Sequence, residues 1–485
     1  MERIISLLFI ISFCLGCNAG IDQLSFFNNT ERNVFRIIDE GGEFDYLTLL
    51  LVTDSNTDSL EIEKSRNIIN ESIDYLNSIG FRDQAPKKQI KILKKHIQGK
   101  YQKSFIRKAT FTGGILKGYY NSYTGTAMYV YFLEFYNIPY VVAENRYYAY
   151  VVAYPENLAI KIISFPPEGE YVESDINGKL NYLNMLKINK VIPGEQSVYL
   201  SEEEYQKYYF PDNIDNIKQV AAMLYHSSGM DFMELPDVYN ANTQFAKAFY
   251  LHKYIRNWYW YYNCLIVLLS KRSFTVNEDY YMLSELANLT VGPQGSPMCE
   301  NLFGLMMNNL NEDQYQLEKG FRIIVNNTTH IPTKNAFAGM YYYERGRICH
   351  NHLDFSKALE FIDSCSNYMP YSKDFETLVL HSVIAYASRI ESTGVVDFVQ
   401  KYNTKFSFLF DIRSFKELMA NAYLQEAYYY FFNKDLESGL KYLDYFEDFY
   451  KQYEELEPDK RIISSAYSEG CRVHFNKRKY TIAKS

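Results

Sequence analysis

Strand-forming sequence is confined to one short part of this chain of 485 residues. A run with helical spacing covers residues 123–136 and ends at the Asn137-Ile138-Pro139 sequence, because the residue before a proline disfavours helical geometry. Three runs rich in Val, Ile, Tyr and Ala follow, separated by turn-like sequences, at residues 140–143, 147–154 and 159–164. The sequence therefore predicts a single α+β unit, one helix followed by three strands, in a chain that is otherwise helical.

The segment before this unit, residues 17–110, is predicted to be helical. Between residues 86 and 105, apolar side chains recur every three or four positions: Ile90, Leu93, Ile97, Tyr101 and Phe105. The opposite face is basic and carries Lys87, Lys88, Lys91, Lys94, Lys95, Lys100 and Lys103. This pattern predicts an amphipathic helix with a solvated basic face, and anionic headgroups are the alternative partner of that face.

Beyond residue 236 the pattern is helical throughout. Gly346, Ala358 and Pro370 stand at the offsets of the small residues and the terminating proline of a tetratricopeptide repeat, which this stretch resembles. Large residues accompany them at Tyr342 and Ile362, and weaker copies are found at Tyr423, Ala427, Tyr430, Gly439 and Leu443, and at Ala246 and Tyr262. We expect a helical repeat array over residues 236–485, with a generic helical bundle as the alternative.

The first residues have the pattern of an export signal. A short charged start precedes an apolar run from residue 4 to 13, which has the length of a secretory core and is too short to span a bilayer. Leu15-Gly16-Cys17 then resembles a lipobox, although Cys14 stands where leucine is usual. We expect removal of residues 1–16 and lipidation of Cys17; cleavage after Ala19 and an uncleaved anchor are the alternatives.

Charge and cysteine content argue against several functional classes. A net charge of −8 argues against a nucleic-acid partner. After Cys17 the cysteines are scattered and form no C-x-x-C pair, which argues against a disulfide framework and a structural zinc site: Cys264, Cys299, Cys349, Cys365 and Cys471. The Cys349-His350-Asn351-His352 sequence has a metal-binding composition, but two histidines two residues apart point in different directions on a helix. We therefore predict no metal site and no cofactor.

The stretch from residue 111 to 175 resembles the transglutaminase-like (papain-related) domains of envelope proteins from Bacteroidota-type bacteria. Those domains carry the motif G-x-Y-N-C-V-T-x-x-A-L-Y at a helix start, and residues 118–129 read GYYNSYTGTAMY. A family G-I-P-Y sequence corresponds to residues 137–140, NIPY, and a final P-x-x-G-Y corresponds to residues 167–171, PEGEY. The resemblance implies an α+β core with a catalytic Cys, His and acid on the helix and two strands.

None of these three catalytic residue types is present at the matching positions, which fall on Ser122, Tyr148 and Ile163. A tyrosine with an ordinary pKa of about 10 is a poor base at neutral pH, and isoleucine accepts no hydrogen bond. No histidine lies between His96 and His226, so none is close in sequence to replace the base. The resemblance therefore implies a pseudo-enzyme in which the three side chains converge without catalysing a reaction.

These observations predict an α+β transglutaminase-like core at 111–175, a connector at 176–235 and an all-α repeat array at 236–485. We expect a lipid-anchored binding or scaffold protein of the bacterial envelope, in a membrane leaflet that the sequence leaves open, with a protein or peptide partner. Glycan or peptidoglycan recognition is one alternative, through a cleft lined by Tyr119, Tyr120, Tyr123, Tyr147 and Tyr148. A divergent hydrolase or acyltransferase is the other.

Overall fold

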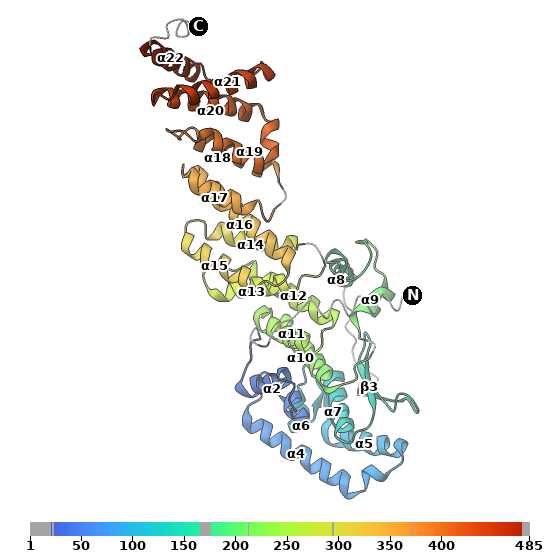
Figure 1. Ribbon diagram of the computed structural model, residues 1–485. Helices are drawn as coiled ribbons and strands as arrows, with labels where there is room; N and C mark the ends of the chain where they lie inside the picture. The colour runs from blue at the N-terminus through green and yellow to red at the C-terminus, as the bar shows by residue number, and fades with distance from the viewer. Residues whose placement is uncertain are drawn as a thin grey trace. The chain divides into compact units, whose positions relative to one another are not determined.

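The computed structural model describes residues 21, 24–164, 176–211, 213–292, 295–369 and 371–477. These residues are mostly helical, and they separate into two compact units that divide between Lys334 and Asn335 (Figure 1). The predicted domain boundaries at 111, 176 and 236 all fall inside the first unit. Each unit is described by itself below.

The first unit contains the described strands and most of the helices. Its helices are α2 (Asn29–Asp39), α3 (Tyr46–Leu51), α4 (Ser59–Ser78), η2 (Phe81–Asp83), α5 (Pro86–Tyr101), α6 (Phe111–Lys117), α7 (Ser122–Phe135), α8 (Ile176–Ile188), α9 (Glu202–Tyr209), α10 (Ile217–Glu234), α11 (Val238–Leu251), α12 (Ile255–Leu269), α13 (Asn277–Asn288), α14 (Pro297–Asn309) and α15 (Gln314–Asn327). Its strands are β1 (Ser104–Phe105), β2 (Tyr119–Tyr120), β3 (Tyr140–Glu144), β4 (Ala149–Ala153) and β5 (Ile160–Ile163).

The predicted helix and three strands are confirmed, each to within two residues. α7 is followed by an antiparallel sheet in the order β3-β4-β5, while β1 and β2 form a separate parallel pair. α7 packs on β3 and β4 and also contacts α10, and Thr126 on α7 donates a hydrogen bond to the Ala149 carbonyl of β4 at 3.1 Å (Figure 1). Because α7 is enclosed on several sides, it is buried nearly all round rather than along one stripe.

Residue alternation in the sheet separates an inner face that meets α7 from an outer face. Ala149, Val151 and Ala153 on β4 are buried, and Ile162 on β5 lies opposite Val151 and is buried with it. Tyr150 on β4 and Lys161 on β5 lie on the outer face, where the Lys161 ammonium is 3.8 Å from the centre of the Tyr150 ring. Successive strand residues point to opposite faces, so a difference of one position decides which side chains meet α7.

The amphipathic helix predicted from residue 86 is confirmed as α5, with Pro86 in its first turn. Ile90, Leu93, Ile97 and Tyr101 are buried along its length. The prediction was wrong at its end: the helix stops at Tyr101, and Phe105 lies on β1 with 39% of its surface exposed. The Gln102 backbone has left helical geometry, and the Lys103 amide bonds to the Gly118 carbonyl instead, so the chain leaves the helix to pair with β2.

A fully buried ion pair joins the start of the chain to the later helices of the first unit. Lys247 on α11 lies 2.7 Å from the Glu31 carboxylate on α2, and both side chains have no exposed surface. The same carboxylate accepts hydrogen bonds from the Tyr225 hydroxyl and the Phe27 backbone amide, each at 2.8 Å. α2 is thereby held against α10 and α11 by a carboxylate whose hydrogen-bonding capacity is met.

The predicted connector, residues 176–235, contains three helices, α8, α9 and α10. α10 packs along α11, and α11 packs along α12. The series of neighbouring helices therefore begins before residue 236, inside the predicted connector. Gly229 on α10 lies so close to α11 that an added Cβ would be 2.7 Å from the Phe245 ring. This glycine is required by the close approach of the two helices.

The second unit consists of helices, which confirms the helical character predicted for this part of the chain. The second unit begins at Asn335, within α16 (Ile331–Asn351). The helices that follow are α17 (Phe355–Cys365), α18 (Lys373–Ala387), α19 (Val395–Lys405), η3 (Ser407–Asp411), α20 (Arg413–Phe432), α21 (Leu436–Gln452) and α22 (Lys460–Asn476). α20 packs against both α21 and α22 (Figure 1). This succession is compatible with a helical repeat array.

The small residues of the predicted repeat lie where two helices approach. A Cβ on Gly346 of α16 would be 3.5 Å from the Ala358 carbonyl and from the Ile362 side chain on α17, and Ala358 is completely buried. Tyr342 stacks on Tyr368 with ring centres 5.8 Å apart. α17 ends at Cys365, and the predicted terminating residue, Pro370, lies outside the described residues.

The second predicted copy is also a pair of neighbouring helices. Tyr423, Ala427 and Tyr430 lie on α20, and Gly439 and Leu443 lie on α21. An added Cβ on Gly439 would be 2.4 Å from the Phe431 ring, so this position too permits close packing of two helices. The fainter pair, Ala246 and Tyr262, is buried on the neighbouring helices α11 and α12.

Among the described residues, no helix has both the length and the apolar character needed to cross a membrane.

Candidate functional site

The start of α7 is the position at which the resemblance places a nucleophile. Asn121 caps the helix by accepting a hydrogen bond from the Thr124 amide at 2.8 Å, and the Thr124 hydroxyl accepts one from the Asn121 amide at 3.0 Å. The Asn121 side chain also donates to the carbonyls of Arg107 and Ala109, which fixes the preceding loop. Ser122 follows as the first helical residue and is 6% exposed. The local sequence thus forms a capped and nearly closed helix start.

The predicted convergence of Ser122, Tyr148 and Ile163 is contradicted by the faces of the sheet. Tyr148 precedes β4 and packs edge to face on Tyr150, with ring centres 5.8 Å apart, and Lys161 lies over both rings. Ile163 is opposite Tyr150 and is 36% exposed. Both side chains therefore belong to the outer face, whereas Ser122 belongs to the helix on the inner face.

The inner-face positions that meet α7 are one residue later on each strand segment. They are Ala149 at the start of β4 and Ser164 directly after β5, and Ser164 is 4% exposed. Ser164 accepts a hydrogen bond from the Gln102 amide at 3.1 Å. A Cβ on Gly125 would be only 2.6 Å from the Ser164 Cβ, so the first turn of α7 touches this part of the chain directly. Neither alanine nor serine supplies the imidazole or the carboxylate that the family chemistry requires.

A carboxylate on the inner face, that of Glu144, is paired with a guanidinium from α12. Glu144 ends β3 opposite Ala149, and its oxygens lie 2.5 and 3.4 Å from the guanidinium nitrogens of Arg256 on α12. The two side chains are 1% and 4% exposed. Tyr123 lies near both groups, and burial raises its pKa well above the ordinary value. The Arg256 guanidinium compensates the charge of the Glu144 carboxylate and occupies its oxygens, so Glu144 is a structural group and not a free general base.

The five tyrosines predicted to line one cleft do not share a surface. Tyr119 and Tyr147 are 38% and 39% exposed, and Tyr120 packs edge to face on Phe105 of β1. Tyr123 faces the buried pair formed by Glu144 and Arg256, on the inner side of the sheet. Tyr148 lies on the outer side. The tyrosines are therefore divided between the two sides, because Tyr123 belongs to α7 and Tyr148 to the outer set of β4.

The other residues that the sequence analysis considered lie elsewhere. Cys17 falls outside the described residues. Cys349, His350 and Asn351 are the last residues of α16, and His350 is hydrogen-bonded to the Ser382 hydroxyl at 2.9 Å. Within the parts of the chain that the structure describes, no three His, Cys, Asp or Glu side chains are grouped so as to hold a metal ion. His226 is buried on α10 beside the Phe245 ring, and burial lowers its pKa far below the ordinary value.

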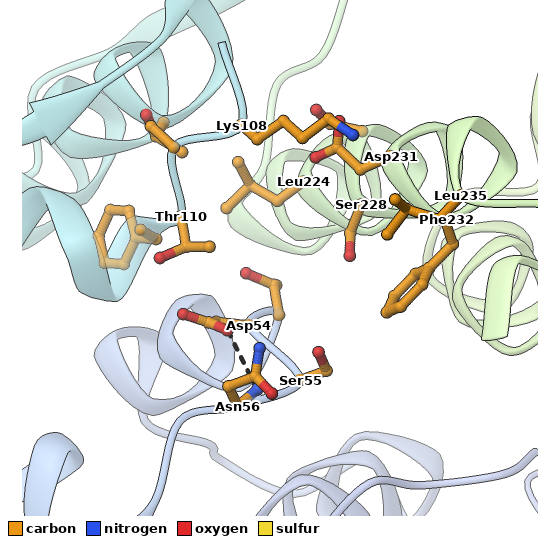
Figure 2. Close-up of a pocket in the computed structure, with 15 residues that line it drawn as sticks. Asp54, Ser55, Asn56, Lys108, Thr110, Leu224, Ser228, Asp231, Phe232 and Leu235 are labelled. Atoms are coloured by element: carbon orange, nitrogen blue, oxygen red, sulfur yellow. Dashed lines mark hydrogen bonds between the residues drawn. The ribbon is translucent and has the colours of Figure 1, made fainter. Parts of the chain in front are cut away.

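An open pocket of about 190 Å³ lies where four segments of the first unit meet, one of which is the first turn of α7 with Thr124. The loop after α3 contributes Asp54, Ser55 and Asn56, the segment before α6 contributes Lys108 and Thr110, and α10 contributes Leu224, Ser227, Ser228, Asp231 and Phe232. Figure 2 shows the Ser228 hydroxyl pointing from α10 toward the loop of Asp54 to Asn56, and the Asp231 carboxylate on α10 beside the Lys108 side chain. Sequence reasoning missed this pocket, because its walls are separated by more than 50 residues along the chain and no motif marks them.

No family model, curated protein or solved structure matches the chain. The pocket, the closed start of α7 and the buried ion pairs are therefore the observations on which a functional conclusion has to rest.

Proposed function

We propose that the protein is a non-catalytic binding or scaffold protein of the bacterial envelope. Its α+β unit is a degenerate transglutaminase-like core, and its helical array presents a surface to a protein or peptide partner. The burial of Ser122, which is 6% exposed, carries this proposal, because a nucleophile has to be reached by its substrate; the close approach of Gly125 to Ser164 in the first turn of α7 supports it.

The chemistry of the surrounding residues supports the same proposal. Coupled catalytic groups lose most of their rate when one member is missing, commonly about 10⁴-fold. The residues here are Ser122, Ala149 and Ser164 on the inner face, and Glu144 is held by Arg256. A serine hydroxyl without a base has no useful nucleophilic population at neutral pH. These residues provide structure rather than proton transfer.

The helical array supports the binding part of the proposal. Helical repeats present extended surfaces that bind protein segments, and aromatic residues are enriched in protein interfaces. α20, α21 and α22 carry five aromatic side chains that are between 37% and 61% exposed: Phe432, Tyr445, Tyr450, Tyr467 and Phe475. These side chains would contribute to an interface with a peptide or protein partner.

Replacing Ser122 with alanine tests the absence of catalysis. The full-length protein and the Ser122→Ala variant are expected to show the same background turnover of amide and ester substrates, and the same partners captured from the native envelope. Ser164→Ala is the matched control, because that serine also lies on the inner face. An amidase, esterase or acyl-transfer activity that is present in the wild type and lost only in Ser122→Ala would establish a divergent hydrolase or acyltransferase instead.

The proposed envelope location rests on the Leu15-Gly16-Cys17 sequence. Growth with a clickable fatty acid is expected to label the wild-type protein and leave Cys17→Ala unlabelled, since the thioether-linked lipid requires that thiol. Cys14→Ala is the control and is expected to retain the label. Equal labelling of wild type and Cys17→Ala, or no labelling of either, would rule out lipidation at this residue.

A further inference from the structure

The pocket at α10 has polar groups that the protein itself leaves without partners. Asp231 is half-buried, and within the described residues its carboxylate has no hydrogen bond and no ion pair, while the neighbouring Lys108 is paired with Glu234 at 2.8 Å. Burial raises the pKa of Asp231 to about 6, and the nearby Lys108 and Arg107 only partly oppose this effect. A carboxylate in this position gains from a hydrogen-bond donor supplied by a ligand.

Beyond Asp231, the lining has a second acceptor on the opposite wall and hydroxyl groups on both walls. One oxygen of the Asp54 carboxylate accepts a hydrogen bond from the Asn56 backbone amide at 3.1 Å (Figure 2), and the second oxygen accepts none among the described residues. Ser55 and Ser227 add hydroxyls that act as donor or acceptor, and Ser228 accepts from the Gln244 amide at 3.2 Å and retains its own proton to donate. The lining therefore combines carboxylate acceptors with hydroxyl groups that can donate or accept a hydrogen bond.

Apolar side chains complete the lining. Leu224, Phe232 and Leu235 come from the same helix as Asp231 or from its end, so they lie beside the polar groups rather than in a separate cavity (Figure 2). A ligand that fits this lining has many hydroxyl groups on its edge and carbon–hydrogen bonds on its faces. Sugars have this combination, and apolar walls with a few well-placed polar groups are typical of small-molecule sites.

We infer that this pocket binds a monosaccharide unit, with Asp231 and Asp54 accepting hydrogen bonds from its hydroxyl groups. The inference goes beyond the proposed scaffold role and does not depend on it. A small organic cation is the competing ligand, because Lys108 and Arg107 near Asp231 are both paired with Glu234, and the test below separates it from a sugar. The sugar site is distinct from the tyrosines of the sheet, which were the residues predicted to bind a glycan.

Ligand-observed NMR of the full-length protein tests the inference with N-acetylglucosamine and glucose as probes. Saturation transfer to the sugar ring protons is expected with the wild type. Asp231→Asn and Asp54→Asn are each expected to weaken binding by about tenfold or more, because each removes a charge-assisted hydrogen bond. Asn at position 54 still accepts from the Asn56 amide, so the loop is retained. Glu203→Gln, on the exposed surface of α9, is the control and is expected to bind as the wild type does.

Three results would overturn the inference. The first is no transfer to either sugar from a wild-type protein with a normal unfolding transition. The second is equal transfer from wild type, Asp231→Asn and Asp54→Asn, which would place a sugar site elsewhere, and Tyr119→Ala and Tyr147→Ala would then test the exposed tyrosines. The third is binding of 1,5-diaminopentane without binding of either sugar, which would identify a site for cations.

Discussion

Replacing Lys247 with methionine is expected to lower the free energy of unfolding of the first unit by about 3–5 kcal/mol. The substitution removes the ammonium group that neutralises Glu31, and both side chains are completely buried. The carboxylate would then have to remain charged without a counter-ion or take up a proton, and either alternative costs free energy. The hydrogen bonds from Tyr225 and Phe27 would remain, but neither supplies a positive charge.

Tryptophan fluorescence is a suitable measurement for this prediction. The chain has two tryptophans, Trp258 and Trp260, and both lie on α12 in the first unit. Their emission during urea denaturation therefore reports on that unit. Lys91→Met, on the exposed face of α5, is the control and is expected to change stability by less than about 0.5 kcal/mol. A loss below about 1 kcal/mol for Lys247→Met would show that the pair contributes little.

The second large effect is expected for Arg256→Met, which leaves Glu144 buried without its guanidinium. We expect a loss of about 3–5 kcal/mol, because breaking a buried pair by removing one partner leaves an uncompensated charge. Glu144 has no other hydrogen-bond donor within the described residues, so the double variant Glu144→Leu with Arg256→Met is expected to recover most of the loss. The double variant separates the cost of an unpaired charge from the loss of packing.

An exposed ion pair of the same unit provides the control for Arg256. Arg36 lies 4.0 Å from Glu40, and both side chains are more than 60% exposed. Arg36→Met is expected to change the free energy of unfolding by at most about 0.5 kcal/mol, since solvent screens such pairs. If Arg256→Met and Arg36→Met behaved alike, or if the double variant were as unstable as Arg256→Met, the structural role assigned to the buried pair would be wrong.

The α+β unit was predictable because its signals are local. An apolar helical run ending at Asn137-Ile138-Pro139, followed by strand-forming runs between turn residues, contains the information within about 40 residues. The faces of the strands were not predictable to the required accuracy. The resemblance places Tyr148, and the strand residues that alternate with it, toward α7, whereas Tyr148 lies in the break before β4 and the set that begins with Ala149 meets α7. A shift of one residue reverses every side chain.

The buried ion pairs depend on contacts that local patterns do not contain. Glu31 and Lys247 are 216 residues apart in the chain, and Glu144 and Arg256 are 112 residues apart. One signal was nevertheless present, since Lys247 lies among the apolar residues Phe245, Ala246, Ala248 and Phe249. A lone charge in such a run needs a buried partner. The partner itself, like the lining of the pocket, follows only from the folded chain.

Arg256 contacts the α+β unit but comes from a helix 112 residues later in the chain than Glu144, and this limits where the protein can be cut into fragments. A fragment that ended at residue 211 would contain α7 and the sheet but would lack α10 and α12. Glu144 would then be without its guanidinium, and the side of α7 that packs on α10 would be open to water. A fragment that retains the pair between Glu144 and Arg256 has to extend into α12 (Ile255–Leu269), so its limit is set by a pair of charges and not by the limits of the resembling motif.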